Sequence, residues 1–156
     1  MKDLTISDID RQNTLNNRLA IEAIQKEIDI TGMLFEGEYR YTKKMIAEFY
    51  DVDISTIDRY LSTNGDELKH NGYILSKGKQ LKDFKLQFGH LINEASKITQ
   101  LGVFNFRSFL NIGMLLTESE TAKHLRSRIL DIVIATINER SGGGTKYINR
   151  RDANYL

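Results

Sequence analysis

The sequence contains no cysteine, no proline and no long run of apolar residues. Without cysteine the chain can form neither a disulfide nor a thiolate metal site, so we expect a protein of the reducing cytoplasm. A membrane helix needs about 20 apolar residues and a signal peptide needs a charged and then apolar start. Neither pattern is present, so we expect a protein that is neither exported nor inserted in a membrane. The absence of proline favours a mostly helical fold, because proline is the residue that breaks helices most strongly.

The patterns that carry catalysis or metal binding are missing too. His70, His90 and His124 lie far apart, and none is followed three or four residues later by a partner able to complete a metal set. The segment SGGGTK follows an expected helix, whereas a phosphate-binding loop follows a strand. Glu118 and Glu120 fall at an expected helix start, where carboxylates are stabilised by the helix dipole. The sequence therefore predicts no enzyme, no cofactor, no metal site and no small-molecule substrate.

Composition indicates a globular protein, and charge is unevenly spread along it. The chain has 156 residues, of which 40% are hydrophobic and 28% charged, which suits one compact domain or a domain with an attached arm. The formal net charge is only +1. Residues 1–62 carry 8 Lys and Arg against 12 Asp and Glu, whereas residues 63–156 carry 14 against 9. A surface that faces phosphates should therefore draw mainly on the second part of the chain.

Periodicity and turn residues predict the order of the elements. Apolar residues at helical spacing predict an N-terminal helical segment over residues 1–32 that packs and ends at Gly32. The residues around Gly37 predict a short strand or hairpin in MLFEGEYRYT. NGYILSKGKQLKDFKLQF, residues 71–88, predicts a strand, a tight turn over residues 76–80 and a second strand. A further strand is expected in LGVFNF, and helices over residues 106–116 and 121–138.

The segment TKKMIAEFYDVDISTIDRYL has the spacing of a helix-turn-helix. Ile46 and Tyr50 give the first helix an inner face, and Ala47 is small enough for the two helices to cross closely. Asp51 stands where glycine is usual, and aspartate tolerates the left-handed conformation that this turn needs. Asp53 is a natural N-cap for the second helix.

The second helix, about residues 54–62, is predicted to read DNA. Ile54, Ile57 and Leu61 form its expected buried stripe. The outward residues, with two residues at the start of the first helix, make up the expected DNA-contacting set: Thr42, Lys43, Ser55, Thr56, Asp58, Arg59 and Ser62. Because Arg59 is the only cation on this helix, its own attraction for phosphates is small.

Lysines further along the chain could supply that attraction. Lys77 and Lys79 flank Gly78 in the expected turn, and Lys82 and Lys85 follow. This arrangement has the form of a basic wing, about residues 76–82, placed against the DNA backbone. The turn on its own also fits a solvated hairpin tip.

The helix-turn-helix segment resembles a known family. YTKKMIAEFYDVDISTIDRYL is similar to the LTQ.QIAELFGVS.STI.RHL pattern of RhuM-like, virulence-associated proteins presumed to bind DNA. Residues 104–133 resemble both the following RhuM-like segment and the closing helix of phage antirepressor-type (BRO-N) domains, through Thr117, Ala122, Lys123 and Arg126. The resemblance covers about residues 38–138, loosely over 66–100. The family's usual histidine is Tyr60 here, so no base contact carries over to that position.

These observations combine into one prediction and one alternative. We expect a mostly helical α+β protein, with a winged helix-turn-helix, a small antiparallel sheet and additional C-terminal helices over residues 33–140. Residues 141–156 are expected to be a glycine linker into a longer polypeptide. The resemblance implies a bacterial or phage-derived regulator or virulence-associated accessory protein, and we expect sequence-specific binding of duplex DNA as a homodimer. The alternative is a protein–protein interaction module on the same scaffold, with its effector role beyond Leu156.

Overall fold

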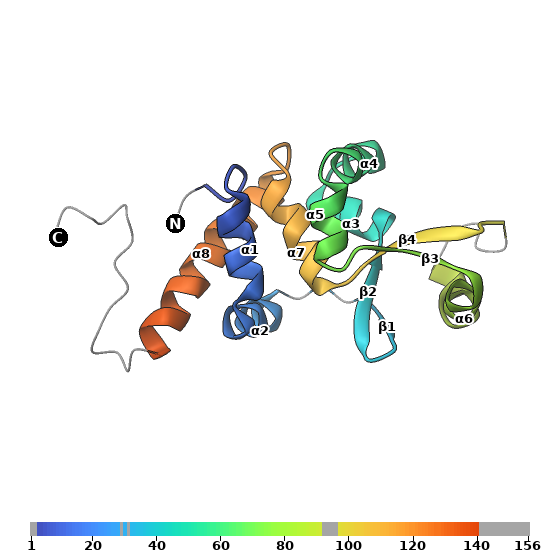
Figure 1. Ribbon diagram of the computed structural model, residues 1–156, viewed down its shortest axis with the longest axis horizontal. Helices are drawn as coiled ribbons and strands as arrows, with labels where there is room; N and C mark the ends of the chain where they lie inside the picture. The colour runs from blue at the N-terminus through green and yellow to red at the C-terminus, as the bar shows by residue number, and fades with distance from the viewer. Residues whose placement is uncertain (1–2, 29, 31, 92–96, 141–156) are drawn as a thin grey trace. The chain divides into compact units, whose positions relative to one another are not determined.

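A computed structural model of the chain describes residues 3–28, 30, 32–91 and 97–140 (Figure 1). Over these residues the chain forms eight α-helices, one short 3-10 helix and a four-stranded antiparallel sheet. The expected mostly helical α+β class is therefore confirmed. The chain divides into two compact units, one made of Met1–Asp29 with Gly113–Leu156 and the other of Ile30–Ile112. The predicted linker, residues 141–156, lies outside the described residues.

The first unit is helical. It contains α1 (Asp8–Asn16), α2 (Arg18–Glu27) and α8 (Glu120–Arg140). The Ser7 hydroxyl accepts a hydrogen bond from the Asp10 amide at 3.2 Å, and the Asn17 side chain accepts one from the Ala20 amide at 3.1 Å. Each bond caps a helix start, so the N-terminal segment holds two helices where one was expected, and the second ends at Glu27 instead of the predicted Gly32. Helix α2 packs against α8, which joins the two ends of the chain in one unit.

The second unit begins with the expected hairpin. Strands β1 (Met33–Phe35) and β2 (Glu38–Thr42) are antiparallel, and Leu34 lies opposite Tyr39. The two residues between them, Glu36 and Gly37, have φ angles of 51° and 82°. Two positive φ angles in a two-residue loop are typical of a type I′ turn, whose twist suits a hairpin.

Two more strands complete the sheet in the order β1-β2-β4-β3. Strand β3 covers Ile74–Lys77 and strand β4 covers Gln100–Phe104, as expected for LGVFNF. They are antiparallel, with Leu75 opposite Gly102 and Lys77 opposite Gln100. Strand β4 also pairs with β2, so this ribbon is continuous with the hairpin.

The prediction of a tight turn and a second strand after β3 was wrong. The chain instead enters helix α6 (Gly78–Phe88), followed by the 3-10 helix η1 (Gly89–Leu91). Gly78 has a φ of 64°, so the glycine serves the change from strand to helix. Leu81, Phe84 and Phe88 recur at intervals of three and four residues, which is a helical spacing that the lysines between them obscured.

The two faces of the sheet carry different layers. Alternate residues of a strand point to opposite faces of a sheet. Ile74 and Ser76 of β3 line one small cavity together with Phe84 of α6, so α6 covers the face that bears these two residues. The other face bears Tyr73, whose ring lies 4.8 Å from that of Phe104. In Figure 1, α6 and α4 (Ile54–Thr63) lie on opposite sides of the β3–β4 ribbon.

An aromatic cluster joins helix α7 (Phe106–Leu115) to α3 (Lys43–Tyr50) and the sheet. The ring of Phe109 stacks on Tyr41 at 5.4 Å and on Tyr50 at 5.3 Å, and it meets the edge of Phe49 at 5.0 Å. The Tyr50 hydroxyl also donates a hydrogen bond of 2.8 Å to the carbonyl oxygen of Phe109. Helix α7 therefore packs against both α3 and the sheet.

No helix among the described residues combines the length and the apolar character that crossing a membrane requires.

Candidate nucleic-acid interface

Helices α3 and α4 are joined by a tight turn with a defined hydrogen-bond pattern. Asp51 ends α3 with φ 55° and ψ 51°, the left-handed conformation expected for it. The Asp51 amide donates to the Glu48 carbonyl oxygen at 3.3 Å, and the Val52 amide donates to that of Ala47 at 3.0 Å. This pair of bonds is the Schellman motif, which satisfies the last carbonyls of a helix. The direction in which α4 leaves α3 is thus set by the backbone.

This turn makes a prediction about Asp51. Asp51→Gly should leave the free energy of unfolding unchanged or raise it by up to about 1 kcal/mol, because glycine adopts the left-handed conformation without strain. Asp51→Val is the matched control and should destabilise the protein, since a β-branched residue resists a positive φ. Urea denaturation of both variants measures the difference. A glycine variant less stable than the parent would contradict the account.

The inner surfaces of the two helices agree with the sequence except at Ile54 and at Leu61, which is half-buried. Ile46, Ala47 and Tyr50 are buried on α3, and Ile57 is buried on α4, as expected. Ile54, expected in the same buried stripe, is 42% exposed, so that prediction was wrong. Ile57 is the one fully buried residue of α4, and the two residues at the start of the helix, Ile54 and Ser55, are exposed.

Asp53 stands at the N-cap position of α4, as expected, but its side chain makes no capping hydrogen bond. The amide of Thr56 instead donates to the backbone carbonyl oxygen of Asp53 at 3.0 Å. The start of α4 is therefore held by the backbone, and the Asp53 carboxylate adds a negative charge beside the helix.

The predicted outward face of α4 is largely present. Ser55, Asp58, Arg59 and Ser62 are exposed, and Thr56 is half-buried. The guanidinium carbon of Arg59 lies 5.0 Å from the centre of the Tyr60 ring, within the range of a cation–π contact. A contact of this kind restricts the conformations of the arginine on the helix surface.

Two residues of the predicted contact set bind each other. The Lys43 Nζ atom at the start of α3 lies 2.8 Å from the Asp58 Oδ1 atom on α4, and both side chains are partly exposed. The pair also acts on Tyr73: burial raises the pKa of this phenol, while Lys43 lowers it and Asp58 raises it. The ion pair therefore links α3 to α4 near Tyr73, the residue that precedes strand β3.

Thr42 has a structural role in this arrangement. It is only 7% exposed, and its hydroxyl accepts a hydrogen bond from the Met45 amide at 3.2 Å. The side chain is the N-cap of α3. As a buried cap, it is not placed to make the DNA contact that the sequence predicted for it.

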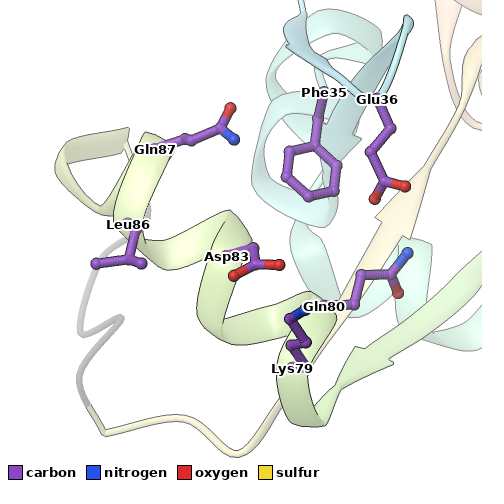
Figure 2. A pocket seen from close by; sticks show the side chains of 7 residues that line it. All are labelled: Phe35, Glu36, Lys79, Gln80, Asp83, Leu86 and Gln87. Atoms are coloured by element: carbon purple, nitrogen blue, oxygen red, sulfur yellow. The ribbon is translucent and has the colours of Figure 1, made fainter.

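The lysines expected on one wing lie on different elements. Lys77 is exposed at the end of β3, and alternation along the strand puts it on the same face as Tyr73, the face opposite α6. Lys79 and Lys82 are exposed on α6. Lys79 lines a groove of about 560 Å³ between α6 and the β1–β2 turn (Figure 2). Its other lining residues are Phe35, Glu36, Gln80, Asp83, Leu86 and Gln87.

A largely buried polar network, which was not foreseen, links the short helix after α4 to α7. Helix α5 (Gly65–His70) follows α4 after one residue. The Asn71 amide nitrogen donates to Asn111 Oδ1 at 2.8 Å, and the Asn111 amide nitrogen donates to Glu67 Oε2 at 2.6 Å. Arg107 Nε donates to Asn71 Oδ1 at 2.8 Å, and burial lowers the pKa of this guanidinium. No spacing in the sequence signals these contacts, because the partners are distant along the chain.

Comparison with known proteins gives no match to a family model, to a curated protein or to a solved structure. The likeness to RhuM-like proteins and antirepressor-type domains therefore stays a prediction. Within the described part of the chain, no three acidic or histidine side chains gather so as to hold a metal ion.

Proposed function

We propose that this protein binds duplex DNA in a sequence-specific manner, with α4 as the recognition helix of a winged helix-turn-helix. The observation that carries the proposal is the α3–turn–α4 unit, in which Ala47 and Ile57 pack inward while Ser55 and Arg59 face outward. In a helix-turn-helix the N-terminal part of the second helix meets base edges in the major groove. Ile54 and Ser55, the exposed residues at the start of α4, suit that role.

The β3–β4 ribbon is the wing in this proposal. It lies beside the helix pair, and Lys77 projects from its α4 side, where a phosphate contact would add to the contacts of α4. Helix α6, which lies between β3 and β4 in the chain, takes the place of the short turn that was predicted at the end of the wing. With the family resemblance, we extend the proposal to a bacterial or phage-derived regulator.

The charge of the helix pair determines how the protein would bind. Residues 43–63 carry three cations, Lys43, Lys44 and Arg59, against four carboxylates, Glu48, Asp51, Asp53 and Asp58. Such a surface attracts phosphates weakly, so affinity must come from base contacts and from a second half-site. We therefore propose a symmetric homodimer, which doubles the contacts on a palindromic site.

Arg59 is predicted to be the most important base-reading side chain of α4. Arg59→Ala should weaken binding to the preferred duplex by about 1–3 kcal/mol if the guanidinium contacts a guanine. Arg59→Lys keeps the positive charge but cannot form two parallel hydrogen bonds to a guanine. Most of the loss of affinity should therefore remain. Fluorescence anisotropy on a panel of duplexes measures both variants. Equal affinity of parent and alanine variant for every duplex would show that Arg59 reads no base.

Lys77 and Lys79 are predicted to differ although they are neighbours in sequence. Lys77→Ala should weaken binding to all duplexes by a similar factor and reduce the magnitude of the slope of log affinity against log salt by about 0.9 for each protomer. Lys79→Ala removes the same charge on the α6 side and should leave the slope unchanged. If the Lys79 variant changes the slope and the Lys77 variant does not, the ribbon is not the wing.

The second candidate function is a protein–protein interaction module. It is favoured by Leu75, which is 48% exposed on the ribbon and offers an apolar contact, while the excess of carboxylates on the helix pair weakens its attraction for phosphates. Salt separates the two functions, because an apolar protein interface is little affected by an increase from 50 to 200 mM salt, whereas phosphate contacts weaken.

A further inference from the structure

Ile54 is an apolar side chain in a polar setting. It is the first residue of α4 and is 42% exposed. The exposed residues around it in sequence, Asp53 and Ser55, are polar, and so is Asp58 one helical turn further on. Since the Asp58 carboxylate is bound by Lys43 at 2.8 Å, the surface beside Ile54 is partly neutralised.

A partner for Ile54 must offer a small apolar group within a polar surface. Protein interfaces have apolar cores made of several side chains, and one isoleucine among carboxylates and serines does not provide such a core. The major groove of DNA offers a single apolar group at each A·T pair, the C5-methyl of thymine, and hydrogen-bonding atoms elsewhere. Its size and setting match an isolated isoleucine.

We infer that Ile54 contacts the C5-methyl group of a thymine and is a specificity-determining residue of α4. The inference rests on the proposed binding of duplex DNA. It assigns two kinds of reading to one helix: Ile54 detects a methyl group through apolar contact, and Arg59, on the next turn, detects a hydrogen-bonding base edge. The preferred site should therefore contain a thymine whose methyl group matters by itself.

The test removes that methyl group without altering any hydrogen bond. A preferred duplex is first selected with the whole chain from a random pool, and each thymine is then replaced singly by deoxyuridine. At one position per half-site the parent protein should bind the deoxyuridine duplex about fourfold more weakly, the equivalent of about 0.8 kcal/mol for one buried methyl-sized group. Ile54→Ala should bind the two duplexes equally.

Two variants serve as controls. Leu86→Ala removes another exposed apolar side chain, 78% exposed on α6, and should keep the full thymine preference. Arg59→Ala should weaken binding but preserve the fourfold difference at the Ile54 position. Alanine is a good helix former and Ile54 is 42% exposed, so the Ile54 variant should melt within a few degrees of the parent.

The outcomes separate this inference from the proposed function. If the parent binds thymine and deoxyuridine duplexes equally at every position, the inference is overturned while DNA binding stands. It is also overturned if Ile54→Ala keeps the thymine preference, or if it changes only the oligomeric state, which sedimentation would show. Failure to select any duplex overturns the proposed function itself.

Discussion

Replacing Phe109 by alanine is expected to lower the free energy of unfolding by about 3–5 kcal/mol, the usual cost of deleting a buried aromatic ring. The ring is fully buried and stacks on Tyr41 and Tyr50, so its removal leaves a cavity between α7, α3 and the sheet. Rings of this kind cannot all shift to fill the space, because each is held by further contacts. A loss of this size is a large part of the stability of an ordinary domain.

Urea denaturation followed by circular dichroism measures this effect, with Phe109→Leu as the matched variant. Leucine keeps part of the buried volume, so it should cost clearly less than alanine. Leu86→Ala, an exposed position on α6, should change stability by less than about 0.5 kcal/mol. A change below about 1 kcal/mol for Phe109→Ala would show that α7 does not brace the helix pair.

Replacing Ala47 by leucine should affect both stability and DNA binding. Ala47 is buried where α3 meets α4, and its carbonyl oxygen accepts the hydrogen bond from Val52. Extra methylene groups in a packed interface typically cost about 1–3 kcal/mol. The larger side chain should also tilt α4, so DNA affinity should fall although no outward residue has changed.

The matched control is Ala135→Leu, the same substitution at an exposed position of α8. It should leave both the thermal melt and the affinity for DNA close to those of the parent. If Ala47→Leu also leaves both unchanged, the two helices do not cross closely. A destabilised variant that still binds DNA with full affinity would show that the geometry of the pair is not needed for binding.

The features that were predicted correctly depend on neighbouring residues. The β1–β2 hairpin follows from Gly37 between two strand-forming segments, and the left-handed turn follows from Asp51 in a position where few residues fit. The inner face of α3 follows from the spacing of Ile46 and Tyr50. Local conformation and periodicity are enough for such features.

The features that were missed depend on what lies nearby in space. Lysines around Gly78 suggested a turn, but Phe84 and Phe88 pack against Phe35 of β1 and so stabilise a helix there. The exposure of Ile54 depends on how far the packing between α3 and α4 extends, which periodicity does not show.

Contacts between residues far apart in the sequence determine which charged side chains of the candidate site are paired. Lys43 and Asp58 lie 15 positions apart and were both predicted to contact DNA, yet they form an ion pair with each other. The network of Asn71, Asn111 and Glu67 joins residues about 40 positions apart. Nothing in the spacing of these residues distinguishes them from solvated polar side chains, so the sequence alone could not reveal their roles.

Selection of duplexes from a random pool by the whole chain tests the central claim, that α4 reads DNA, most directly. After several rounds the account predicts one enriched palindromic motif, bound at least about 10³-fold more tightly than an unrelated duplex, and loss of most of this preference in Arg59→Ala. A pool without an enriched motif, with the same affinity for every duplex tested, would contradict the claim.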